Sequence, residues 1–172
     1  MTLSRRSMLL SLPVLLSGVL PVLTACSGRA VSQMPDLPFT ELDGQARRLA
    51  DLQGKVVVLN FWATSCSTCV KEMPRLVETH TRFKAQGLET LAVAMSYDPP
   101  AYVMQFAQTR QLPFRVAIDH DGGLARAFGD VQLTPTTLVI DRKGQIVKRY
   151  VGEPDFAALD DLITRLLGQP PA

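Results

Sequence analysis

Two cysteines, Cys66 and Cys69, lie where an apolar run of sequence changes into a helical pattern, and this junction constrains the fold more than any other feature. The run over residues 56–61 reads Val-Val-Val-Leu-Asn-Phe, which is typical of a strand buried on both faces. The helical pattern begins at once, so the sequence predicts a dithiol at the N-terminus of a helix. There, free backbone N–H groups and the helix dipole stabilise a thiolate. A partly exposed thiolate of this kind can exchange with the disulfide of a partner protein.

Residues 1–25 are predicted to be an export signal that is not part of the fold. Arg5 and Arg6 form a basic start, and the apolar stretch over 9–23 that follows is interrupted by two prolines. It is shorter than the roughly 20 apolar residues of a membrane-spanning helix, and the pattern is typical of a secretory signal. The run over 4–9 also resembles a twin-arginine signal, so the export route stays open between the general secretory and twin-arginine pathways.

The end of this segment, residues 23–26, reads Leu-Thr-Ala-Cys and resembles a bacterial lipobox. The resemblance implies that Cys26 becomes a lipid-modified N-terminus after cleavage, which would anchor the protein on the periplasmic side of the cell envelope. Ser27 lacks the acidic character associated with retention in the inner membrane of enteric bacteria, so the choice between inner and outer membrane stays open. An ordinary signal peptide with a coincidental cysteine is the alternative.

Charge and cysteine content limit the function further. Removal of residues 1–25 removes two arginines and leaves 16 basic and 16 acidic residues, so no strong field for nucleic acid or anionic lipid is expected. An exported chain reaches a compartment where disulfides persist. Cys26 accounts for the anchor, and Cys66 and Cys69 then form the only remaining pair among the three cysteines.

The chain beyond the signal is predicted to be a short tether over 26–35 and one domain over 36–172. A helix predicted over residues 98–110 is expected to place Tyr102, Val103, Phe106 and Ala107 on its inner face, toward the sheet. The apolar periodicities and turn residues predict these elements in order: a strand pair within 39–49, a strand over 55–61, a helix over 67–86, a strand over 88–95, a helix over 98–110, a strand over 114–118, a short helix over 123–128, a hairpin of 137–140 with 146–151, and a helix over 155–167. This order predicts an α/β fold with a central mixed sheet flanked by helices and an N-terminal β extension.

Several separated motifs together resemble the thioredoxin fold over residues 36–168. They are Trp62-Ala63-x-x-Cys66-x-x-Cys69, Pro74, Thr134-Pro135-Thr136, Gly144 and Gly152. The run Cys-Val-Lys-Glu-Met-Pro over 69–74, with the segment between the second helix and Pro135, resembles the TlpA/ResA branch of that family. The resemblance implies a membrane-tethered thiol–disulfide oxidoreductase in which Cys66 and Cys69 are the redox-active pair.

The resemblance also assigns residues around the dithiol. Pro135 matches a cis-proline that faces the cysteines and lets the backbone of Thr134 pair with an extended substrate segment. Trp62 is expected to form a wall beside the dithiol and is assigned to substrate binding. One departure is Ser65, which stands where thioredoxins carry a tryptophan, and it opens the surface next to Cys66.

A second departure concerns proton transfer. Asn60 stands where cytosolic thioredoxins have a buried aspartate, so another group is needed to help deprotonate the buried thiol. Glu72 follows Cys69 by three residues and therefore lies on roughly the same helix face. The branch carries a functional glutamate at this position, and the alternative is an acid that only favours the helix dipole.

The resulting hypothesis is an enzyme that reduces disulfides in partner proteins, such as the haem-attachment cysteines of apocytochromes c or the copper-site cysteines of an oxidase subunit. A DsbD-like or CcdA-like membrane protein would supply electrons. A monomer without cofactor, metal or nucleic acid is expected. The sequence does not give the direction of electron flow.

Two alternatives are a thiol peroxidase and a Cu(I)-binding metallochaperone. A peroxiredoxin has threonine and proline before its cysteine, but Ala63 and Leu59 stand at those positions here. Two thiolates can bind Cu(I), yet no methionine or histidine cluster lies near the pair in the sequence. A purely structural disulfide is disfavoured, because closing so short a loop stabilises little.

Overall fold

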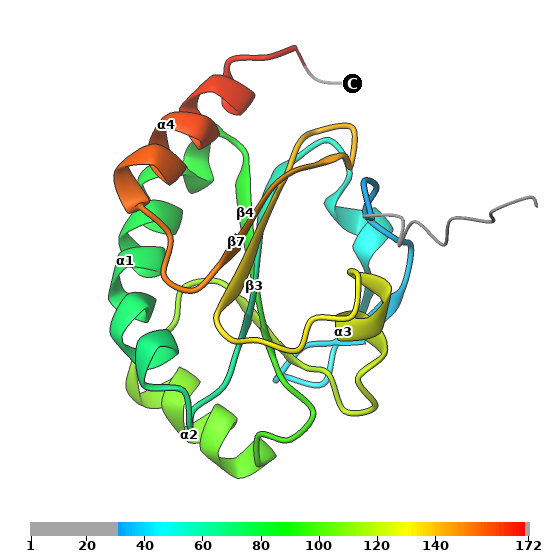
Figure 1. The fold of residues 1–172 in the computed structure, drawn as a ribbon, viewed down its shortest axis with the longest axis vertical. Coiled ribbons are helices and arrows are strands. Elements are labelled where there is room, and N and C mark those ends of the chain that lie inside the picture. The colour runs from blue at the N-terminus through cyan, green and yellow to red at the C-terminus, as the bar shows by residue number, and fades with distance from the viewer. Residues whose placement is uncertain (1–30, 171–172) are drawn as a thin grey trace, which may run out of the picture.

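A five-stranded mixed sheet forms the centre of the protein (Figure 1). The computed structural model describes residues 31–170, so the predicted signal, Cys26 and the first half of the tether lie outside the described residues. The strand order is β5-β4-β3-β6-β7. The strands are β3 (Val56–Trp62), β4 (Leu88–Ala94), β5 (Arg115–Ile118), β6 (Thr136–Ile140) and β7 (Ile146–Val151). The first three are mutually parallel, and β6 runs antiparallel to both β3 and β7, which confirms the predicted mixed sheet.

The two faces of the sheet are covered differently. One face packs against α1 (Ser67–Phe83), α2 (Pro100–Thr109) and α4 (Phe156–Leu167), and the other against α3 (Gly123–Ala127) and the N-terminal extension. Short 3-10 turns follow β2 at Leu49–Leu52 and α1 at Lys84–Gln86. The order of strands and helices is the predicted one, with boundaries shifted by a few residues at most. No helix within residues 31–170 is long and apolar enough to cross a membrane.

The continuous apolar run of β3 follows from its central position. All seven residues are buried, and successive side chains point to opposite faces of the sheet. Val57, Leu59 and Phe61 join the core under the extension, whereas Val58 and Trp62 join the core under the helices. A strand that serves two cores needs apolar residues at nearly every position.

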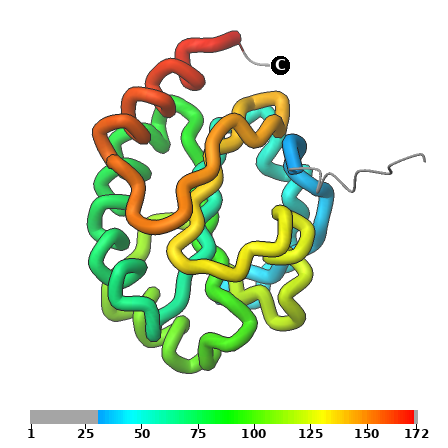
Figure 2. Tube along the Cα trace, in the orientation of Figure 1, coloured from blue at the N-terminus to red at the C-terminus, as the bar shows by residue number. Residues whose placement is uncertain are grey.

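The N-terminal extension spans the sheet from one edge to the other. It contains the predicted strand pair, β1 (Pro38–Thr40) and β2 (Ala46–Arg48), and Figure 2 shows it on the side of the sheet that also carries α3. Gln33 bridges to Gln145 beside the start of β7, and Glu41 bridges to Ala117 in β5. The extension thereby occupies part of both sheet edges, which otherwise present unpaired N–H and C=O groups.

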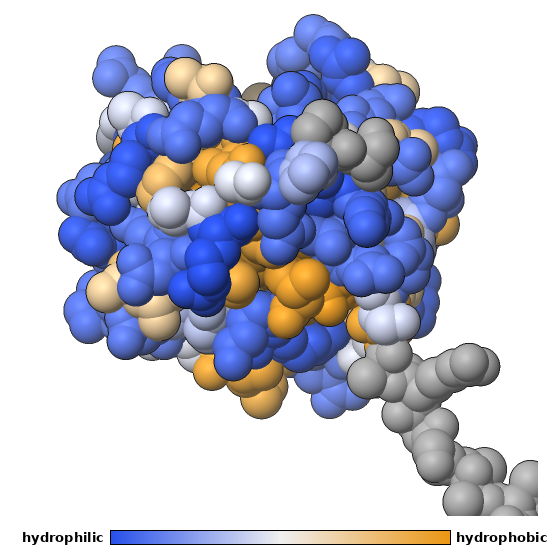
Figure 3. Space-filling view, turned by 90° about the horizontal axis from the view of Figure 1, so that it is seen from above, coloured by the Kyte–Doolittle hydropathy of each residue, from blue (hydrophilic) through white to orange (hydrophobic). Residues whose placement is uncertain are grey.

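The carboxyl end of β3 and the start of α1 lie at the lower end of the molecule in Figure 1. Figure 3 views the opposite end, where α4 finishes, and hydrophilic residues dominate that face.

At the start of α4, the Asp155 carboxylate accepts hydrogen bonds from the N–H groups of Ala157 and Ala158. This is the usual way in which an N-cap residue satisfies helix donors.

The prediction for Tyr102 was wrong. Its side chain is 61% exposed, whereas Val103 is buried and Phe106 and Ala107 pack beside it. These three residues have the i, i+3, i+4 spacing of one helix stripe, and Tyr102 lies one position before it. The short helix α2 therefore covers the sheet with a narrower apolar stripe than its number of apolar and aromatic residues indicates.

Candidate redox site

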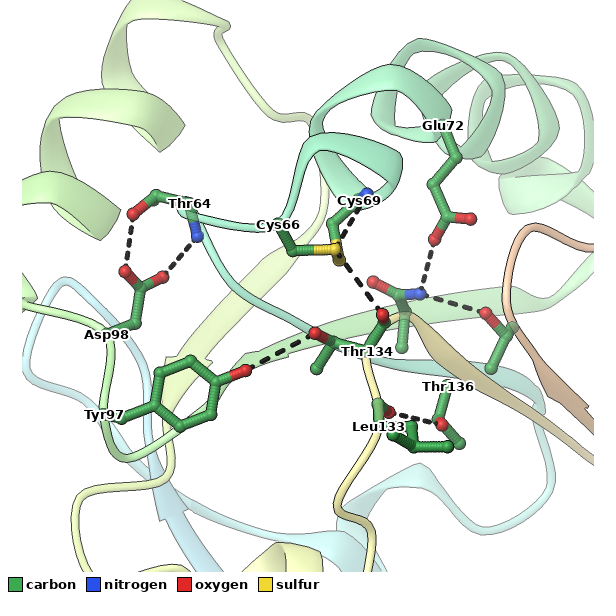
Figure 4. Close-up of a disulfide and its surroundings, with 11 residues drawn as sticks. Thr64, Cys66, Cys69, Glu72, Tyr97, Asp98, Leu133, Thr134 and Thr136 are labelled. Atoms are coloured by element: carbon green, nitrogen blue, oxygen red, sulfur yellow. Dashed lines mark hydrogen bonds between the residues drawn. A yellow bond between two sulfur atoms is a disulfide. The ribbon is translucent and has the colours of Figure 1, made fainter.

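The redox site lies where β3 ends and α1 begins. Cys66 and Cys69 are joined by a disulfide with Cα atoms 5.2 Å apart, as the spacing predicted (Figure 4). Cys66 is the N-cap residue of α1, and its sulfur accepts a hydrogen bond from the N–H of Cys69 at 3.1 Å. The helix thus directs one of its free donors at the first sulfur, which stabilises negative charge there when the disulfide opens.

The two cysteines differ in accessibility. The side chain of Cys69 is fully buried within the apolar core under the helices, whereas Cys66 is only half-buried. A partner's disulfide can therefore approach Cys66 but not Cys69. The two sulfurs are therefore inequivalent by geometry alone.

The loop before β6 faces the dithiol. The Thr134–Pro135 peptide bond is cis, and the carbonyl oxygen of Thr134 lies 3.6 Å from the sulfur of Cys66. Gly152 N–H donates to the carbonyl of Pro135 at 2.8 Å, and the Thr136 hydroxyl donates to the carbonyl of Leu133 at 2.7 Å. These bonds hold the loop so that the backbone of Thr134 is presented next to Cys66, where the sequence placed it.

Glu72 is a fully buried carboxyl group one turn after Cys69. One of its oxygens accepts a hydrogen bond from the Asn60 amide at 3.0 Å, and the same amide donates to Thr137 at 2.9 Å. The other oxygen of Glu72 has no hydrogen-bond partner among the described residues. Burial raises the pKa of Glu72 to about 7, with a further increase from the charge of Glu153 and an opposing effect from the Asn60 bond.

The contact between Asn60 and Glu72 was not predicted, although both residues were singled out. The sequence showed only that an aspartate is missing from β3 and that an acid follows Cys69. In the structure the Asn60 amide holds the Glu72 carboxyl group, so these two residues form one buried unit on β3 and α1. A carboxyl group with a pKa near 7 is suited to exchange a proton at neutral pH.

The assignment of Trp62 to substrate binding was wrong. Its side chain is fully buried and packs on Phe106 with ring centroids 5.1 Å apart. It belongs to the same apolar cluster as Cys69 and is therefore a wall behind the dithiol, without a surface that a substrate could touch. Large exposed apolar side chains near the site are instead Tyr97 and Leu133, at 58% and 65% exposure.

Sequence reasoning missed the segment after β4. The backbone N–H and the hydroxyl of Thr64 both donate to the Asp98 carboxylate, at 2.6 and 2.5 Å, and the hydroxyls of Tyr97 and Thr134 lie 3.4 Å apart (Figure 4). The available signal was topological. Residues that follow two neighbouring parallel strands meet at the same edge of a sheet, and β4 is the parallel neighbour of β3.

The fold and the asymmetric cysteine pair define a thioredoxin-like thiol–disulfide oxidoreductase. The chain belongs to the Redoxin family, which matches residues 29–163. It is 39% identical over 121 residues to the thiol-disulfide oxidoreductase ResA of Geobacillus thermodenitrificans, covering 70% of this chain and 68% of that protein. The ResA of Bacillus anthracis is 34% identical over 134 residues, with 78% and 76% covered.

Solved structures agree with this family. A Neisseria meningitidis protein assigned as a thioredoxin is 42% identical with a TM-score of 0.73, over 78% of this chain and 90% of that chain. An exposed lipoprotein thioredoxin of Streptococcus pneumoniae is 27% identical with a TM-score of 0.68, over 77% and 100%. The thioredoxin-like fold and the oxidoreductase class predicted from the sequence are thereby confirmed. Within residues 31–170, no group of three or more histidine, cysteine or acidic side chains is arranged to hold a metal ion.

Glu72→Gln should change how stability depends on pH. Between the ordinary glutamate pKa of 4.5 and about 7, folded Glu72 keeps a proton that the unfolded chain has lost, so wild-type stability falls as pH rises through this range. Glutamine does not titrate and can still accept the Asn60 bond. The free energy of unfolding of the variant relative to wild type should therefore rise by up to about 3 kcal/mol between pH 4.5 and 8. Chemical denaturation of the oxidised protein at several pH values measures this.

The matched control is Glu78→Gln, an exposed acid on the same helix. Its stability profile should run nearly parallel to that of wild type. A parallel profile for Glu72→Gln as well would show that the buried carboxyl group does not titrate in this range.

Proposed function

We propose that this protein reduces disulfides in partner proteins of the bacterial cell envelope. One observation carries the proposal, namely that the two cysteines differ in exposure. Cys66 is accessible and accepts a hydrogen bond from the helix, whereas Cys69 is buried. A dithiol of this form transfers two electrons to a substrate disulfide and becomes a disulfide itself.

The first step is attack by Cys66. Its thiolate forms a bond to one sulfur of the substrate disulfide, the substrate S–S bond breaks, and the other substrate sulfur leaves as a thiolate that takes up a proton. The carbonyl of Thr134 and the cis peptide bond beside it present backbone for an extended substrate segment, as in strand addition. This pairing holds the mixed disulfide next to Cys69.

The second step needs Cys69 as a thiolate. Its proton passes to the carboxylate of Glu72, one turn along α1, directly or through one water molecule. The Cys69 sulfur then attacks Cys66, the mixed disulfide breaks, and the second substrate sulfur leaves as a thiolate. A carboxyl group with a pKa near 7 both accepts this proton and releases it to solvent at neutral pH.

We further propose which partners the protein meets and where it is held. Apocytochrome c or copper-site cysteines are substrates of suitable chemistry, and a membrane thiol–disulfide donor of the DsbD or CcdA type would return two electrons to the pair. The lipobox-like run ending at Cys26 supports a lipid anchor, and a relative of known structure is an exposed lipoprotein.

The reduction potential of the pair tests the direction of electron flow. A reductase requires a strongly negative potential, near the thioredoxin value of about −270 mV. Equilibration of the purified domain with glutathione or dithiothreitol buffers, followed by quantification of the free thiols, measures it. A value near the DsbA range of about −120 mV would identify an oxidase and overturn the proposed direction.

Trapping tests the roles of the two cysteines and identifies partners. Cys69→Ser leaves Cys66 able to attack but removes the resolving sulfur, so mixed disulfides should accumulate in cells. Cys66→Ser leaves only a buried sulfur and should trap far less. Non-reducing electrophoresis followed by mass spectrometry of the trapped adducts compares the variants. Equal trapping by both variants would contradict the assignment of Cys66 as the nucleophile.

The anchor is tested by Cys26→Ala in the full-length protein. A single acyl chain binds membranes only marginally, whereas two or more hold firmly, as on bacterial lipoproteins. Wild type should therefore stay with membranes in high salt, and the variant should be released or remain uncut. Membrane fractionation with mass analysis of the N-terminus measures both. Normal cleavage of the variant, together with salt release of wild type, would contradict the lipid anchor.

A further inference from the structure

We propose that Asp98 is a positioning residue for the reactive cysteine, acting through Thr64, and that Tyr97 extends the same support to the Thr134 loop. The proposal rests only on the thiol exchange of Cys66 and not on the identity of the envelope partner. Tyr97 and Asp98 lie between β4 and α2, outside the cysteine motif and outside the cis-proline loop. They contact both.

The Asp98 carboxylate is buried, at 2% exposure, and both of its oxygens are used on one residue. One oxygen accepts the Thr64 N–H and the other accepts the Thr64 hydroxyl. The backbone of Asp98 is itself fixed, since its N–H donates to the carbonyl of Met95 at 2.9 Å. A rigid acceptor at the end of β4 therefore holds the loop that leads into Cys66.

The Asp98 carboxylate does not cap α2, although it lies just before this helix. An aspartate at the N-cap position normally accepts hydrogen bonds from the first turn, but the N-cap of α2 is Pro99, one residue after Asp98. Here α2 begins at Pro100 after Pro99, and no side chain caps it. Prolines at these two positions have no N–H to satisfy, so the Asp98 side chain is free to reach across to Thr64.

The contacts close a ring that includes the sulfur of Cys66 (Figure 4). Thr64 precedes Cys66 by two residues, and the Cys66 N–H donates to the carbonyl of Ala63 at 3.2 Å, so the loop is tight. On the other side, the Thr134 carbonyl lies beside the sulfur, and the Thr134 hydroxyl lies 3.4 Å from that of Tyr97. The ring sets where Cys66 sits relative to the helix donor and to the substrate-facing carbonyl.

Thr64→Val tests this, because it removes the hydroxyl donor without a change in charge and with almost the same volume. Cys66 should be held less well against the helix donor, so the reduced protein should react with iodoacetamide three- to tenfold more slowly at neutral pH. Exchange with oxidised glutathione should slow as well. The potential of the pair should become more negative, since the reduced form loses stabilisation. Thr64→Ser keeps the donor and should restore wild-type values.

The control is Thr81→Val, the same substitution on the exposed face of α1, which should change neither the rates nor the potential. If Thr64→Val lowers only the free energy of unfolding and leaves rates and potential unchanged, Asp98 has a structural role alone and the proposal is overturned. A purely electrostatic role would also overturn it. In that case Thr64→Val would have no effect, and Asp98→Asn, which removes a nearby negative charge, would make Cys66 more reactive.

The part of Tyr97 is tested by a double-mutant cycle. Tyr97→Phe keeps the ring but removes the hydroxyl that faces Thr134. If both contacts position the same sulfur, the combined effect of Tyr97→Phe and Thr64→Val on the iodoacetamide rate should differ from the product of the separate effects. Independent effects would overturn the role of Tyr97. Iodoacetamide and glutathione involve no envelope partner, so these results do not depend on the trapping experiment.

Discussion

The hydrogen bond from the first turn of α1 to the sulfur of Cys66 is the interaction on which the site depends. It exists because a fully buried strand delivers the chain to one end of the sheet and the helix starts within a few residues. The strand can be this apolar only because both its faces are covered. The N-terminal extension, which looks peripheral in the sequence, supplies the second cover together with α3 and is therefore a condition for the geometry of the dithiol.

Burial then gives the symmetric Cys-x-x-Cys sequence its asymmetric chemistry. Three residues of helix carry the chain from a half-buried sulfur to a fully buried one, and three more carry it to a buried carboxyl group. An isolated carboxylate at such a position would be costly, and the protein limits the cost by the Asn60 bond and by a raised pKa. The same burial that raises the pKa of Glu72 to about 7 makes the folded state sensitive to pH.

The sequence predicted the elements well, because their signals are local. Alternation and apolar runs identify strands, and turn residues such as Asp43-Gly44 and Lys143-Gly144 separate them. The cysteine pair was equally clear from its spacing. The wall formed by Trp62 was expected, but its assignment to substrate binding and the placing of Tyr102 on an inner face were wrong. Residue type alone does not say how far a side chain is buried in a particular packing. The contacts of Asp98 with Thr64 and of Asn60 with Glu72 join residues 34 and 12 positions apart. The pairing of β3 with β4 brings the first two together, and the packing of α1 on β3 brings the second two together.

The distribution of charge and apolar surface bears on how partners are selected. With equal numbers of acidic and basic residues after the predicted signal, long-range electrostatic steering contributes little, and short-range contacts around Cys66 must discriminate. Ser65 leaves the approach to Cys66 open, and the exposed Tyr97 and Leu133 lie on segments that contact the cysteine loop or the Thr134 loop. In the proposed ring of contacts through Cys66, Tyr97 serves two purposes, since it both holds the Thr134 loop and presents its aromatic ring to the partner. Substitutions there would then alter reactivity and partner choice together.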